Sequence, residues 1–175
     1  QDKYSVRCSP QVIGVLRDTI TWVKEWIEVE INSVNDNPII DEENKKILNS
    51  GNFYGGHISV AMDSLKISLL NIADLIDKQV SLVIDEKFNN GLPPNLAPLH
   101  ELEHTGEAGI NHAFKAAQIT VTALAAEAMS LMIPASLLSR PTESMNQDKV
   151  SMGMIASQKT SQTIDILEKM FAIQL

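Results

Sequence analysis

The sequence predicts an all-α protein built from long helices that pack side by side. Hydrophobic residues make up 44% of the 175 residues but aromatic residues only 5%, so the core is expected to be aliphatic. Apolar residues recur at helical spacing in four long segments, 10–32, 57–86, 110–133 and 148–175. No segment alternates convincingly with the two-residue period of a strand. A bundle of long helices follows, as a single helical portion spanning 1–175.

The first segment, 10–32, opens with Pro10, which is well tolerated in the first turn of a helix. The second segment, 57–86, carries charged residues along its length, including Asp63 and Lys66. The third, 110–133, is rich in alanine, and small side chains allow helices to approach closely. We therefore expect this third helix to be central and buried. The fourth, 148–175, is expected to begin with Asp148 as its N-cap.

The connections between these helices are long and polar. They cover residues 33–56, 87–109 and 135–147. Ordered loops of such length are commonly functional, because a rigid scaffold can position their side chains. We expect the chemistry of this protein to lie in its loops.

Charge and cysteine content restrict the possible partners and compartment. Lys and Arg total 14 against 22 Asp and Glu, for a net charge of -8, which disfavours nucleic acid and anionic membrane surfaces as partners. The single Cys8 excludes an internal disulfide and fits a reducing, cytoplasmic location. We expect no membrane-spanning stretch and no signal peptide. The chain starts without Met and ends within a helical pattern, so we expect a fragment of a longer protein.

One short motif raises a zinc hypothesis. His100, Glu101 and His104 form a His-Glu-x-x-His pattern, which on a helix could hold zinc and a general base. The extended form of this motif needs Gly and His where this chain has Glu107 and Ile110. We expect no metal, and stoichiometric zinc in the purified protein would revive a zinc hydrolase.

Several loop motifs carry a stronger signal when they are taken together. They are "QDKYSVR" (1–7), "SVNDNPI" (33–39), "GNFYGG" (51–56), "GLPP" (91–94) and "TESMNQDKVSMG" (142–153). Each alone could be a tail, a turn or a helix cap. In this order, separated by long helices, they resemble the aromatic amino acid ammonia-lyases and aminomutases over essentially the whole chain.

The resemblance implies elimination of ammonia from an L-amino acid to give an α,β-unsaturated acid. The family's electrophile, methylidene-imidazolone (MIO), forms from an internal Ala-Ser-Gly, which this chain lacks. The resemblance therefore implies a middle-to-C-terminal portion without the MIO-bearing N-terminal part, inactive in isolation. It also implies a homotetramer whose active sites combine residues from three subunits, with the N-terminal part supplied as a segment or a second chain.

The resemblance assigns catalytic roles to three residues. Tyr4 matches a tyrosine beside the prosthetic group, which orients the amine or relays protons. Glu143 matches an acidic residue near the amino group, where a carboxylate can accept a proton. Gln147 matches an amide that orients substrate and active-site hydroxyls.

Four further residues are assigned to substrate binding. Arg7 matches the arginine that grips the substrate carboxylate with its planar fork. Phe53 matches an aromatic residue that packs near the reactive ring. Asn146 and Asn37 match amides of the substrate site.

The substrate remains open between members of the family. Histidine-specific members carry an extra acidic residue where this chain reads "NQDK", so tyrosine or phenylalanine is favoured over histidine. Tyr54 stands where many members have His or Gln. A 2,3-aminomutase begins with the same elimination and is an alternative. A non-catalytic helical assembly protein is the second alternative, although it would not need this set of polar side chains.

Overall fold

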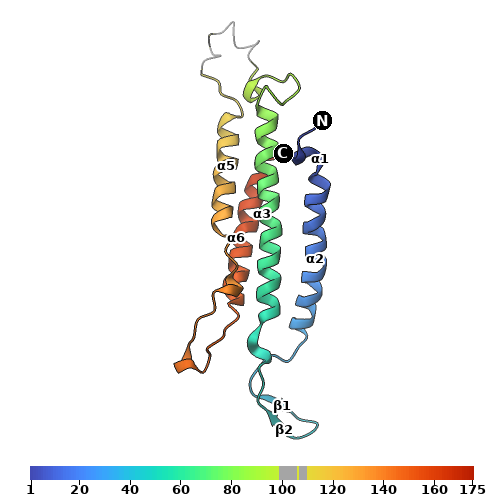
Figure 1. Ribbon diagram of the computed structural model, residues 1–175, viewed down its shortest axis with the longest axis vertical. Coiled ribbons are helices and arrows are strands. Elements are labelled where there is room, and N and C mark those ends of the chain that lie inside the picture. The colour runs from blue at the N-terminus through green and yellow to red at the C-terminus, as the bar shows by residue number, and fades with distance from the viewer. Residues whose placement is uncertain (99–105, 107–109) are drawn as a thin grey trace. The chain divides into compact units, whose positions relative to one another are not determined.

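The structure is a computed structural model that describes residues 1–98, 106 and 110–175. Helices dominate it, so the predicted fold class is confirmed (Figure 1). The α-helices are α1 (Tyr4–Arg7), α2 (Ser9–Ile31), α3 (Gly56–Ile84), α5 (Lys115–Ser130) and α6 (Gly153–Gln174). Short 3-10 turns occur at η1 (Asn52–Tyr54), η2 (Pro94–Leu96), η4 (Ala135–Leu137) and η5 (Glu143–Met145).

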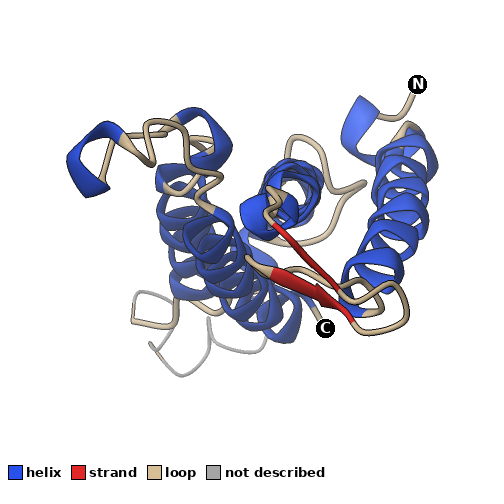
Figure 2. Cartoon of the chain, turned by 90° about the horizontal axis from the view of Figure 1, so that it is seen from below, coloured by secondary structure: helices blue, strands red, loops and turns tan. Residues whose placement is uncertain are grey.

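A small hairpin departs from the expectation of no strands. Strands β1 (Ile39–Asp41) and β2 (Lys46–Leu48) pair antiparallel within the connection between α2 and α3 (Figure 2). The Asp41 carboxylate closes the turn by accepting bonds from Asn44 N at 3.0 Å and Asn44 Nδ2 at 2.9 Å. These two bonds lower the pKa of Asp41, and the bond from the Asn44 backbone has the larger effect. Three-residue strands are too short to leave a clear period in the sequence.

Two helix starts also differ from the sequence-based expectation. Helix α5 begins at Lys115, and α6 begins at Gly153. The expected N-cap role of Asp148 is wrong, because the residues up to Met152 continue the preceding loop. Met152 has a left-handed φ of 59°, and its carbonyl accepts the bond from Ala156 N that opens the helix.

The chain divides into two compact units. The first comprises residues 1–14, 69–131 and 163–175, and the second comprises 15–68 and 132–162. The core of the first unit is aliphatic, with Ile76, Val121 and Met170 among its buried side chains. The buried side chains of the second unit are more polar. They include Thr19, Ser59, Asp63, Lys66, Ser68 and Thr160.

Helix α5 is not the buried central helix that its alanine content predicted. Of its residues, only Val121, Ala125 and Ala128 are buried, and Ile119 is 56% exposed. An 18-residue window within the segment Lys115–Leu137 has a mean hydropathy of 1.5, and 17% of that window is buried. Among the described residues it is the one segment long and apolar enough to cross a membrane by length and composition, contrary to the expectation of none.

Candidate active site

A pocket of about 910 Å³ in the second unit gathers four of the seven predicted site residues. Asn37 and Phe53 come from the connection before α3, whereas Asn146 and Gln147 come from the loop before α6. The remaining lining residues are Gly51, Tyr54, Lys149, Val150, Ser151, Met152, Gly153, Met154 and Ile155. The connection before α3 and the loop before α6 are far apart in sequence, so only the fold brings their residues together. Ser59 and Ser151, which are hydrogen-bonded to each other and of which Ser151 lines the pocket, are separated by 92 positions.

Hydrogen bonds hold the first wall of this pocket. Asn37 Oδ1 accepts a bond from Ser50 N at 3.0 Å, and Ser50 Oγ donates to Asp36 O at 3.1 Å. Asn52 Nδ2 donates to Val34 O at 3.4 Å. These bonds join the residues before β1 to the residues after β2. They hold the Asn37 side chain at the end of the hairpin that lies next to the pocket.

Aromatic side chains continue this wall into the start of α3. Phe53 and Tyr54 lie on η1 and remain 54% and 40% exposed. The Tyr54 ring lies so close to Gly56 that a Cβ there would be 2.6 Å from Tyr54 Cε1. Gly55, with a φ of 65°, allows the chain to turn between the ring and the helix. The pocket therefore has an apolar, aromatic side.

The second wall is a tight loop closed by backbone bonds. Thr142 N donates to Gln147 O at 2.9 Å, and Gln147 N donates to Thr142 O at 3.2 Å. Thr142 Oγ1 also donates to Gln147 Oε1 at 3.1 Å. Between them Glu143, Ser144 and Met145 all have left-handed φ values, of 51°, 52° and 73°. Backbone conformations of this kind are uncommon for non-glycine residues and cluster at functional sites.

Glu143 belongs to this loop but not to the residues that line the pocket. Its side chain is exposed, and its carbonyl accepts the bond from Asn146 N at 3.0 Å. Glu143 therefore shapes the backbone that presents Asn146. Its role near an amino group stays a prediction.

Tyr4 and Arg7 lie together on α1, which belongs to the first unit. The Arg7 guanidinium is 4.8 Å from the centroid of the Tyr4 ring and donates to Gln1 Oε1. Gln79 Nε2, on α3, donates to Ser5 O at 2.8 Å and so anchors this short helix. Sequence reasoning left out Gln1, although it begins the same motif.

Tyr4 lines a separate pocket of about 390 Å³, also within the first unit. Lys3, Lys78 and Asp85 supply charged groups there, and Lys3 Nζ lies 5.1 Å from the centroid of the Phe88 ring. Tyr4 itself is 71% exposed, so its hydroxyl is accessible to a group from outside this chain.

The zinc hypothesis concerns residues 100–104, which lie outside the described residues. Within 1–98, 106 and 110–175, no group of three His, Cys, Asp or Glu side chains is arranged to hold a metal.

Comparison with known proteins identifies the protein family that has this fold. The family model for aromatic amino acid lyases matches residues 1–175. The chain is 40% identical over 174 residues to tyrosine ammonia-lyase of Cereibacter sphaeroides, covering 99% of this chain and 32% of that protein. It is 38% identical to histidine ammonia-lyase of Stigmatella aurantiaca, covering 100% of this chain and 32% of that protein.

Solved structures agree with this assignment. Phenylalanine aminomutase of Pantoea agglomerans superimposes with a TM-score of 0.90 at 32% identity, covering 99% of this chain and 33% of that one. Tyrosine aminomutase of Streptomyces globisporus gives a TM-score of 0.87 at 34% identity, covering 99% and 31%. The chain belongs to the aromatic amino acid lyase family, and it spans 32% of the length of the two relatives named above.

Proposed function

We propose that this chain is the middle-to-C-terminal portion of an amino acid ammonia-lyase that acts on an L-aromatic amino acid. The observation that carries the proposal is the pocket that gathers Asn37, Phe53, Asn146 and Gln147. Membership of the family supports the same reaction class. The reaction releases ammonia and leaves an α,β-unsaturated acid.

The described residues suit the binding of such a substrate. The Asn146 and Gln147 amides offer donors and acceptors for polar groups, while Phe53 offers a flat apolar surface for an aromatic ring. In the proposed tetramer, whose active sites would combine residues from three subunits, Arg7 would supply the guanidinium fork for the carboxylate. Glu143 would supply a carboxylate that accepts a proton from the amino group.

The prosthetic group would come from outside this chain, because the sequence has no Ala-Ser-Gly. MIO, when present, supplies the electrophile that makes elimination of the amine possible. An exposed phenyl ring and three side-chain amides line the pocket, which supports the proposal that a planar heterocycle of this kind would lie there. Phe53 would pack near that group, and the accessible Tyr4 hydroxyl would orient the amine or relay a proton beside it.

Tyrosine or phenylalanine is the favoured substrate, and histidine is less favoured. The aromatic Phe53 and Tyr54 in the pocket support this choice, as does the tyrosine ammonia-lyase relative. The 2,3-aminomutase alternative has support from the two aminomutase structures. A non-catalytic assembly protein is the remaining alternative, and the preorganised polar wall of the pocket argues against it.

We also propose a cytoplasmic homotetramer that includes the MIO-bearing portion. The exposed apolar side chains of α5 and α2 support assembly, because such surface is usually covered by a partner. They include Val15, Ile20, Val29 and Ile119. The acidic composition and single Cys8 fit the cytoplasm.

The test is an assay of the catalytically complete protein with L-tyrosine, L-phenylalanine and L-histidine, following the absorbance of unsaturated acids. We expect activity with an aromatic substrate and none with residues 1–175 alone. A complete protein that releases no ammonia from any of the three would overturn the proposal. A β-amino acid product would favour the aminomutase.

Arg7→Ala tests the assigned carboxylate contact in the same assay. Removing one partner of a bonded charge pair costs about 2–5 kcal/mol, so we expect kcat/KM to fall by roughly 100-fold with the fold intact. Unchanged turnover would remove Arg7 from the substrate site.

A further inference from the structure

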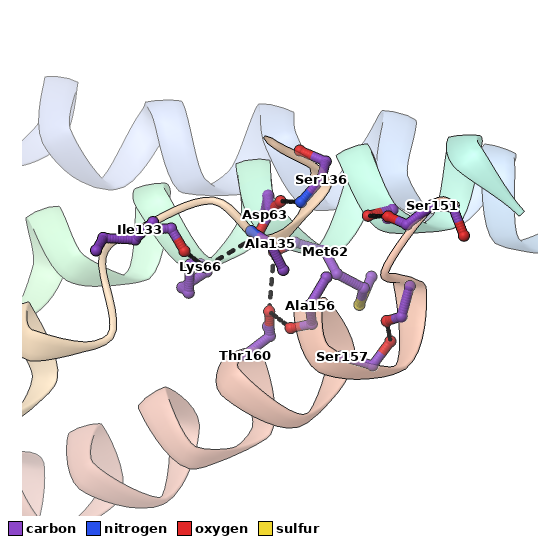
Figure 3. A network of polar contacts seen from close by, with 12 residues as sticks. Met62, Asp63, Lys66, Ile133, Ala135, Ser136, Ser151, Ala156, Ser157 and Thr160 are labelled. Carbon is purple, nitrogen blue, oxygen red and sulfur yellow. Dashed lines mark hydrogen bonds and ion pairs between the residues drawn. The ribbon is translucent and has the colours of Figure 1, made fainter. Parts of the chain in front are cut away.

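A buried ion pair lies on α3, outside the residues that line the 910 Å³ pocket (Figure 3). Lys66 Nζ donates to Asp63 Oδ1 at 2.9 Å, and the side chains are 0% and 5% exposed. Burying two charges carries a desolvation penalty that an apolar pair would avoid. The pair therefore calls for an explanation beyond the packing of the helix.

Both charged groups hold the backbone of one loop. Asp63 accepts bonds from Ala135 N at 3.0 Å and Ser136 N at 2.8 Å, and Lys66 donates to Ile133 O at 3.1 Å (Figure 3). Residues 133–136 begin the connection that carries the predicted site residues to α6. The ion pair thus holds the start of this connection, which covers residues 133–152, against α3. The start is called the entry below, and the end, near Ser151, is called the exit.

The exit of the same connection is fixed one helical turn earlier on α3. Ser59 Oγ donates to Ser151 O at 2.6 Å, and Ser151 lines the pocket. Between entry and exit, Val150 N donates to Ser139 Oγ at 2.9 Å. Just past the exit, Thr160 Oγ1 donates to Met62 O at 2.9 Å, which ties α6 to the same stretch of α3.

We propose that Asp63 and Lys66 are positioning residues that, with Ser59, clamp both ends of the loop presenting Asn146 and Gln147. Hydrogen bonds specify a position in a way that apolar contacts do not, and small displacements of positioning groups have large effects on rate. The proposal rests on the proposed function, since it assigns the clamp to the elimination reaction. It adds residues that touch neither substrate nor prosthetic group.

Asp63→Leu/Lys66→Met removes the clamp at the entry while keeping apolar volume in the core. Lys24→Met/Glu28→Leu is the matched control, because Lys24 and Glu28 form an exposed ion pair on α2. In the complete enzyme we expect the first variant to lose at least about tenfold in kcat/KM well below its melting temperature. We expect the control to keep the activity of the wild type.

Ser59→Ala is a milder second variant, for use if the first does not fold. Its control is Ser68→Ala, a buried serine of α3 that bonds Thr19 and Ser64 O but not the loop. Loss of one hydrogen bond should speed amide hydrogen exchange across 145–152 by about fivefold in Ser59→Ala and leave it unchanged in Ser68→Ala.

The outcomes separate the clamp from the reaction. Faster exchange in the loop together with lower kcat/KM supports the proposal. Wild-type kcat/KM in Asp63→Leu/Lys66→Met, or wild-type exchange in Ser59→Ala, overturns it and leaves the proposed function standing. A wild-type enzyme without elimination activity overturns the proposed function, and hydrogen exchange then still decides whether the loop is clamped.

Discussion

At the scale of single residues, Asp63 shows how burial and hydrogen bonding compete. Burial raises the pKa of this carboxyl group, but bonds from Lys66, Ser136 and Ala135 outweigh burial and lower the pKa below its ordinary 3.8. The folded state therefore favours the charged form of Asp63 more than the unfolded state does.

This shift predicts how the stability of the protein depends on pH. A depressed folded-state pKa contributes stability above the unfolded value, and this contribution is lost as pH falls from there through the folded-state pKa. In Asp63→Asn we expect a shallower loss of stability in the acid range below about pH 5. Urea unfolding between pH 7 and 3 measures it. An unchanged pH profile would mean that Asp63 does not contribute.

Residue identity alone could not reveal the role of Asp63. The sequence shows a charged residue three positions before Lys66 on a helix, which is typical of an exposed ion pair. Its backbone partner Ala135 lies 72 residues further along the chain. The fold, rather than the pattern, brings them together.

At the scale of elements, long helices were predictable because their apolar period repeats over many turns. The α2 prediction, 10–32, agrees closely with Ser9–Ile31. The short elements were not predictable. Helix α1 and the β1–β2 hairpin each span too few residues for a period, and local side-chain bonds such as that of Asp41 stabilise them.

The resemblance assigned seven residues to one site, and four of them line one pocket, but the sequence did not show how the loops are held. Asn37 and Gln147 were chosen from the resemblance, and the structure places both in one pocket. Apolar pocket residues such as Ile155 carried no signal in the sequence, because they look like ordinary helix residues. Glu143 lies beside the pocket rather than in its lining.

The start of α3 offers a test of the aromatic wall. Gly56→Ala would place a Cβ 2.6 Å from Tyr54 Cε1, so the ring must move. We expect a loss of about 1–3 kcal/mol in the free energy of unfolding from this overpacking. In a Tyr54→Ala background, where the ring is absent, Gly56→Ala should lower the free energy of unfolding by less. Equal losses in both backgrounds would show that the clash does not occur.

At the scale of the whole molecule, the exposed apolar surface calls for a partner. Helix α5 was expected to be buried, and in this chain most of it is exposed, including Ile119 at 56%. Any further burial of that helix would come from outside the described residues. The proposed tetramer would provide it.

Ile119→Asp tests this surface. A charge placed in an apolar interface is costly to desolvate, so we expect the assembly to dissociate at concentrations where the wild type stays associated. Lys46→Asp, at an exposed position of β2 outside α2 and α5, is the control. Analytical ultracentrifugation measures both. An Ile119→Asp variant with the wild-type sedimentation coefficient would mean that this face is not the interface.

The pocket around Gln147 is the proposed place of the elimination, and the decisive measurement is kcat/KM of Gln147→Leu in the complete enzyme. The side chain keeps its approximate volume but loses its amide. We predict a fall of roughly 100-fold or more, as for the loss of an oriented hydrogen-bonding group at a reacting centre. The free energy of unfolding should fall by no more than about 1 kcal/mol, from the lost bond between Thr142 Oγ1 and Gln147 Oε1. A variant with wild-type kcat/KM would contradict the account and place the reaction elsewhere in the molecule.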